Sequence, residues 1–153
     1  MMHSGKLAAA LVALLLAAPA VALDAEQAEK ITETRQGLLK VVGWNFTPLN
    51  AMARGLVPWD DALVERNAQR IAWMTTMIPD AFRGDTRGHA LDTEARPVIW
   101  ERFDRFEELA TNAQSSAERL VEVAAGGDEA ATKRAISALL DDCRACHNDF
   151  RDN

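Results

Sequence analysis

The pentapeptide Cys-Arg-Ala-Cys-His at positions 143–147, close to the C-terminus, constrains this chain more than any other feature. A C-x-x-C-H spacing is the attachment pattern of a c-type haem, in which two thiols form thioethers with the haem and the histidine bonds the iron. On a helix, Cys143, Cys146 and His147 project from one face, because they are spaced three and four residues apart. The pattern predicts Cys143 and Cys146 as haem-attaching residues and His147 as an axial ligand.

The cysteine pair has three other interpretations. A redox-active C-x-x-C pair usually belongs to a thioredoxin-like strand–helix unit, and the sequence shows no such pattern. A structural zinc site needs four ligands, whereas the chain has only two cysteines and three histidines. The third interpretation is a chance spacing on an ordinary helix. We favour haem over all three, with the dithiol and the zinc site kept as alternatives.

The first 22 residues have the pattern of a secretory signal peptide. Lys6 supplies a positive charge, and the apolar run over residues 7–22 is shorter than the about 20 residues that a membrane span needs. Ala20-Val21-Ala22 fits a cleavage site, so we expect a mature domain of residues 23–153. No cysteine follows that site to carry a lipid. We therefore expect a soluble periplasmic protein without a membrane anchor, in a compartment that suits haem attachment after export.

The charge of the chain excludes one class of partner. Cleavage after Ala22 would leave 16 basic and 23 acidic residues, and so a formal charge of −7. Such a surface is a poor match for nucleic acid. A basic periplasmic redox partner would suit it, but many soluble proteins without such a partner are equally acidic, and solubility is the simpler explanation.

Hydrophobic periodicity predicts four helices and no strands. Apolar residues recur near the 3.6-residue period over residues 24–56, 59–78, from Pro97 to Gly126-Gly127, and after an N-cap at Asp128. Pro48 is expected to kink or break the first helix, and Pro79 to stop the second. Residues 79–96 form the one long predicted connection.

These four segments predict an all-α, antiparallel, up-down-up-down four-helix bundle, because helices of about 20 residues joined by short turns pack in this way. In the last helix, the haem-attaching residues continue an apolar stripe that contains Ile136, Leu139 and Leu140. If this stripe faces the interior, the haem does so too. We therefore expect a covalently bound haem in the core of the bundle.

Three segments together resemble the cytochrome c′ family, and the resemblance covers essentially the whole mature chain. They are the pentapeptide at 143–147 with Phe150-Arg151 behind it, Arg35-Gln36-Gly37-Leu38-Leu39, and Arg96-Pro97-Val98-Ile99-Trp100. The resemblance implies a four-helix bundle with one covalently attached haem c per chain. Members of the family are often dimers through their first two helices, so a homodimer is an option here.

The resemblance also implies roles for two residues of the first helix. The arginine at the place of Arg35 approaches a haem propionate, and the residue four positions on, here Leu39, covers the distal face of the iron. Some members of the superfamily have a methionine there, whose sulfur gives a six-coordinate, low-spin iron. Leucine has no donor atom, so we predict a five-coordinate, high-spin iron with His147 as its only protein ligand. Arg151 is implied to border the proximal side.

The predicted function is therefore binding of small diatomic gases, nitric oxide and carbon monoxide, by a cytochrome that also takes part in electron transfer. No enzymatic activity is expected. The alternative is a low-spin electron-transfer cytochrome with a second protein ligand, for which Met74, Met77 and a solvent-exposed His89 are the candidates.

Overall fold

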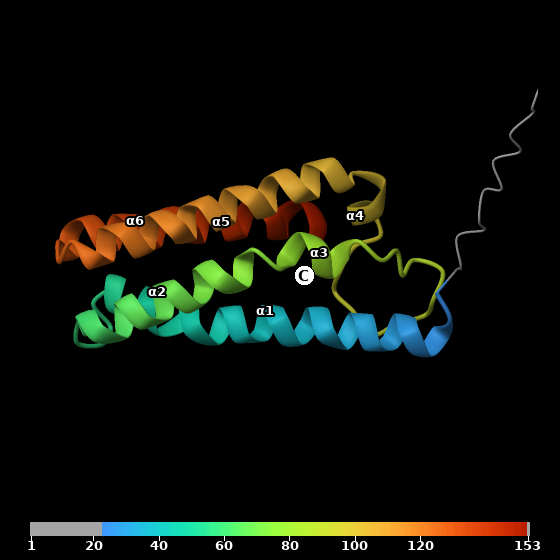
Figure 1. The fold of residues 1–153 in the computed structure, drawn as a ribbon, viewed down its shortest axis with the longest axis horizontal. Helices are drawn as coiled ribbons and strands as arrows, with labels where there is room; N and C mark the ends of the chain where they lie inside the picture. Colours follow the sequence, from blue (N-terminus) through green and yellow to red (C-terminus); the bar gives the residue numbers. More distant parts are fainter. Residues whose placement is uncertain (1–22, 153) are drawn as a thin grey trace, which may run out of the picture.

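The computed structural model describes residues 23–152, which form an all-α bundle of four long helices (Figure 1). The helices are α1 (Ala25–Ala53), α2 (Asp61–Thr75), α3 (Ile78–Phe82), α4 (Val98–Glu101), α5 (Phe103–Ala125) and α6 (Glu129–Phe150). The long helices α1, α2, α5 and α6 alternate in direction along the bundle, as Figure 1 shows. The predicted fold class and topology are confirmed. The predicted signal peptide lies outside the described residues and stays a prediction.

Aspartate side chains begin three of the long helices. Asp24, Asp60 and Asp128 each accept a hydrogen bond from the backbone N–H three residues on, at 2.8, 2.9 and 2.9 Å. Such caps satisfy N–H groups that have no partner within the helix. Between α5 and α6, Gly127 takes a positive φ of 70°, which a residue without Cβ adopts at little cost. The predicted N-cap at Asp128 is confirmed.

The predicted break at Pro48 does not occur, since α1 continues through this residue to Ala53. Proline removes one backbone donor, but a long packed helix tolerates that loss when the neighbouring turns are held by tertiary contacts. Leu49, directly after the proline, is fully buried and provides such contacts. The helix ends three residues earlier than predicted, and Gly55 follows with a φ of 72°.

The predicted helix over 59–78 is too long, and Pro79 does not stop it. Helix α2 ends at Thr75, and Pro79 lies in the first turn of the separate helix α3. A proline is well accommodated there, because the first N–H groups of a helix have no acceptor within it. The predicted third helix is also divided: Arg102, with φ −127° and ψ 43°, separates α4 from α5.

The core consists of two clusters at different levels of the bundle. The first joins α1, α2, α5 and α6 through Leu49, Met52, Val64, Ile71, Leu120, Ile136 and Leu139, among others. The second joins α3, α4, α5 and α6 through Phe82, Ile99, Phe106, Leu109 and Phe150. Cys143 packs against the first cluster and Cys146 against the second. The C-x-x-C segment therefore lies where the two clusters meet.

A short backbone bridge fixes the end of α6. The amide of Arg96 donates to the carbonyl of Phe150 at 3.0 Å, and the amide of Asp152 donates to the carbonyl of Glu94 at 2.8 Å. The Arg96 side chain adds a hydrogen bond to the Asp149 carbonyl at 2.9 Å. We call residues 94–96 with 150–152 the C-terminal bridge. It ties the long connection before α4 to the end of the helix that carries the pentapeptide.

The helices within residues 23–152 are those of a bundle in which polar residues recur along every long helix. None of these helices is both long enough and apolar enough to cross a bilayer.

Candidate haem site

The three predicted attachment residues lie on the last two turns of α6. Cys143 and Cys146 are free thiols and half-buried, whereas His147 is more exposed. Ile136, Leu139 and Phe150 define the buried face of α6. Cys143 falls within it, and Cys146 and His147 fall at its two edges. Both cysteines, unlike His147, pack against a core cluster. The expectation that the attachment residues continue the apolar stripe therefore holds better for the two thiols than for the imidazole.

Burial raises the pKa of both thiols. The pKa of Cys143 rises from 9.0 to about 11 through desolvation, with a further rise caused by the charge of Asp142. The pKa of Cys146 also rises to about 11 through desolvation, with Cys143 and Asp149 adding to it. Redox-active C-x-x-C pairs have a lowered pKa, because the thiolate is their nucleophile. The environment of this pair thus weighs against a dithiol oxidoreductase.

The raised pKa values give a direct prediction for the haem-free protein. With a pKa of about 11 in place of 9.0, each thiol forms about a hundredfold less thiolate at pH 8 than it would in an unfolded chain. Iodoacetamide should therefore alkylate Cys143 and Cys146 far more slowly at urea concentrations below the unfolding transition than at concentrations above it. Mass spectrometry measures the two alkylation rates. Alkylation that is faster in the folded protein would contradict the assignment and favour the dithiol alternative.

A zinc site finds no support in the arrangement of side chains. Over residues 23–152 there is no group of three or more His, Cys, Asp and Glu side chains that could hold a metal ion. The pentapeptide alone provides at most three ligands, one fewer than structural zinc sites use.

His147 has charged neighbours in the C-terminal bridge. The atoms packed around its ring lower its pKa, the positive charge of Arg151 lowers it further, and the charge of Glu94 opposes both. The neutral imidazole is the form that binds a metal. The surroundings of His147 therefore favour the protonation state that an axial ligand needs at neutral pH.

Arg35 is a buried cation with an incomplete set of partners. It is 3% exposed, and its Nε donates to the Ala81 carbonyl at 2.7 Å while Nη1 donates to Thr86 Oγ1 at 3.0 Å. Nη2 donates to the Gly84 carbonyl. Its guanidinium carbon lies 4.9 Å from the ring centre of Phe82 and 5.2 Å from that of Trp100. Sequence reasoning did not find these partners, which no local pattern reveals.

The electrostatics of Arg35 suit an additional anion. Desolvation lowers its pKa from 12.5 to about 10, and the charge of Asp85 offsets this only partly. Among the side chains of residues 23–152, no carboxylate lies within ion-pair distance of its guanidinium. A guanidinium has five N–H donors, and the hydrogen bonds of Arg35 to Ala81, Gly84 and Thr86 use three of them. Two remain for a carboxylate such as a haem propionate, the contact that the family resemblance implies for this residue.

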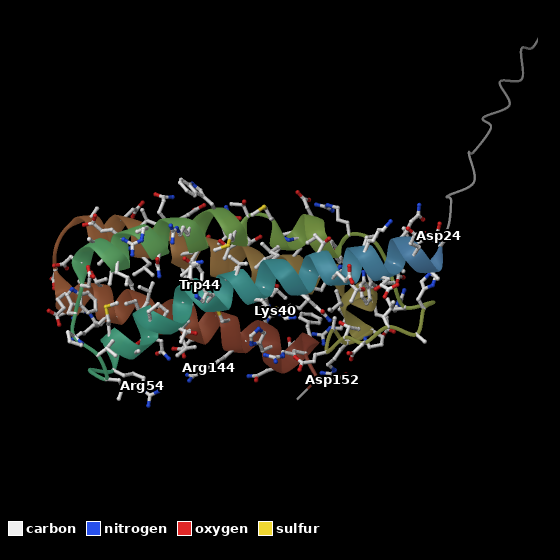
Figure 2. All side chains as sticks on the ribbon, turned by 90° about the horizontal axis from the view of Figure 1, so that it is seen from below. Asp24, Lys40, Trp44, Arg54, Arg144 and Asp152 are labelled. Atoms are coloured by element: carbon white, nitrogen blue, oxygen red, sulfur yellow. The ribbon has the colours of Figure 1, made fainter. Side chains whose placement is uncertain are left out.

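Leu39 lies one turn after Arg35 on α1. It is 37% exposed and belongs to neither core cluster. Helices α1 and α6 contact each other, so the helix with Arg35 and Leu39 lies beside the helix with the pentapeptide. Figure 2, seen from the α1 side, shows Lys40 and Trp44 further along α1, Arg144 on α6, and Asp152 beyond the end of α6. An apolar side chain here can cover the face of a flat apolar group.

These features together fit a covalently bound haem. The two thiols lie between two apolar clusters, a buried guanidinium has spare donors for a propionate, and Leu39 offers an apolar surface without a donor atom. The structure thus places each predicted site residue on α1 or α6, two helices in contact. Their roles in haem binding remain predictions.

Comparison with known proteins identifies the family. The family model described as Cytochrome C′ matches residues 30–151. Cytochrome c-554 of Cereibacter sphaeroides is 34% identical, with 90% of each chain covered. Cytochrome c′ of Pararhodospirillum photometricum is 34% identical, covering 81% of this chain and 98% of its own. The structure of cytochrome c′ from Rhodobacter sphaeroides superposes with a TM-score of 0.75 at 28% identity, covering 84% of this chain and 98% of its own. The chain therefore belongs to the cytochrome c′ family, whose members carry a covalently attached haem c.

Proposed function

We propose that this protein is a periplasmic cytochrome with one haem c per chain, attached through Cys143 and Cys146 and bonded at the iron by His147. The iron is five-coordinate and high-spin. It binds nitric oxide and carbon monoxide on the face that Leu39 covers, and takes part in electron transfer. The protein acts by binding and electron transfer, without an enzymatic activity.

The observation that carries the proposal is the position and chemistry of Leu39. It lies one turn from Arg35 on a helix in contact with α6, and its side chain cannot bond iron. Met52 is buried in the first core cluster and is committed to packing. His89, expected to be exposed, is instead partly buried in a groove against Ala25, Glu29 and Gln36. This groove lies along the N-terminal half of α1, which contributes Ala25, Glu29 and Gln36 to it.

The chain's own residues set which ligands are accepted. Haem, when bound, supplies an iron with one open coordination position. Leu39 must be displaced before a ligand can occupy the covered face, so large ligands are disfavoured. It also offers no hydrogen bond, and stable oxygen binding usually requires a distal donor. Nitric oxide and carbon monoxide, which bind haem iron without such a donor, are therefore the favoured ligands.

One feature supports the alternative of a low-spin electron carrier. Met77, in the turn between α2 and α3, is 47% exposed, so its thioether is not tied to the core. Thioether ligation would make the iron six-coordinate and block gas binding. The test between the two functions is whether the reduced haem binds carbon monoxide or nitric oxide. Binding supports the open site; a spectrum that is indifferent to both gases supports a second protein ligand.

A further inference from the structure

Glu94 and Arg151 form an ion pair across the C-terminal bridge. Glu94 Oε2 accepts from Arg151 Nε at 2.6 Å and lies 2.5 Å from Nη2. The two nitrogens thus share one carboxylate oxygen. Charge-assisted contacts of this kind restrict a guanidinium more than a single neutral hydrogen bond does. The sequence places these residues 57 positions apart, and no local pattern predicts their contact.

The backbone of the C-terminal bridge fixes both partners. Ala95 and Arg151 form an isolated antiparallel β-bridge, and the amide of Asp152 donates to the carbonyl of Glu94. Both side chains therefore start from backbone positions that are held relative to each other. The carboxylate has only a short distance to span, which makes Glu94 well placed to select one orientation of the Arg151 side chain.

The pair lies next to the predicted iron ligand. The Arg151 amide donates to the carbonyl of His147 at 3.0 Å, one helical turn earlier. Arg151 and Glu94 are also the two charged groups that influence the His147 ring, in opposite directions and with the larger effect from Arg151. A charge held at this place acts on the His147 side of a bound haem.

We propose that Glu94 is a positioning residue, which holds the guanidinium of Arg151 beside His147 so that a fixed positive charge raises the haem reduction potential. The proposal rests on the proposed ligation of haem iron by His147. One-electron reduction removes one positive charge from the iron, so a nearby cation favours the reduced state. An unanchored arginine would spend part of its time in solvent and have a smaller effect.

Because the Glu94–Arg151 pair is exposed, its effect on the reduction potential can be measured separately from any effect on stability. The side chains of Arg151 and Glu94 are 48% and 65% exposed, and exposed ion pairs contribute little to stability. Substitutions at either position should leave the fold intact. The electrostatic effect on the haem should also weaken as salt rises, because exposed charges are screened.

The test is a double-substitution cycle on the intact haem protein, read out as reduction potential by spectroelectrochemistry. Arg151→Gln alone should lower the potential, with an about tenfold change in the equilibrium constant for reduction, the scale expected for one nearby charge that solvent partly screens. In the Glu94→Gln background, the same substitution should have less than half that effect. Glu94→Asp, which keeps a carboxylate, should restore at least part of the coupling.

Glu129→Gln is the matched control, because it removes one carboxylate from an ion pair at the other end of α6, with Lys133 at 2.6 Å. The effect of Arg151→Gln should be unchanged in that background. An equal effect of Arg151→Gln with and without Glu94 would overturn the positioning role while leaving the proposed function intact. Absence of covalently bound haem from the wild-type protein would overturn both.

Discussion

Replacement of Leu39 by methionine should convert the haem iron from five-coordinate, high-spin to predominantly six-coordinate, low-spin. The thioether is a haem ligand, and the side chains of leucine and methionine are close enough in volume for the exchange to be tolerated. Because Leu39 belongs to neither core cluster, the substitution leaves the packing of both unchanged. The spin state is measured by absorption and electron paramagnetic resonance spectra of the oxidised protein. Carbon monoxide affinity should fall with it.

The neighbouring Leu38→Met substitution is the matched control. Leu38 is partly buried on the same helix, about 100° around its axis from Leu39. The Leu38→Met substitution should therefore leave the iron high-spin. A high-spin spectrum from Leu39→Met as well would mean that Leu39 does not face the iron, and the assignment of the covered face would be wrong.

Arg35→Leu should destabilise the protein by about 2–3 kcal/mol, because buried hydrogen-bond acceptors lose the donors that satisfy them. The change leaves the acceptors of Ala81, Gly84 and Thr86 without the donors that the guanidinium supplies. It also removes the cation that lies over the rings of Phe82 and Trp100. The free energy of unfolding is measured by urea denaturation of the haem-free and haem-bound proteins.

Lys40→Leu serves as the control, since Lys40 is an exposed cation on the same helix (Figure 2). It should change the free energy of unfolding by no more than about 0.5 kcal/mol. Arg35→Lys should fall between the two, because an ammonium keeps the charge but cannot reproduce three diverging N–H donors. A loss below about 1 kcal/mol for Arg35→Leu would contradict the importance of this network.

The helical bundle could be predicted because its signals are local. Apolar periodicity and an aspartate N-cap such as Asp128 depend on residues within a few positions of one another. Prolines were harder to interpret: Pro48 lies within a helix and Pro79 begins one. Whether a proline breaks a helix or fits its first turn depends on where packing lets the helix start. That information is not contained in the local sequence.

The same distinction between local patterns and long-range contacts applies to the candidate site. The pentapeptide alone indicates both thiols and the iron ligand, because haem attachment demands one spacing on one helix. Neither the burial of Arg35 against two aromatic rings nor the pairing of Glu94 with Arg151 has such a signal. Both depend on contacts between segments about 50 residues apart or more. The sequence therefore indicated the candidate haem-attaching residues but not the long-range contacts of Arg35 and Arg151.

The most direct test of the central claim is the absorption spectrum of the purified wild-type protein, oxidised and reduced, before and after addition of carbon monoxide. An iron with His147 as its only protein ligand predicts high-spin spectra in both states, and a reduced spectrum that changes on adding the gas. A sharply split, low-spin reduced spectrum that carbon monoxide leaves unchanged would contradict it. The second ligand would then be sought at Met74, Met77 or His89.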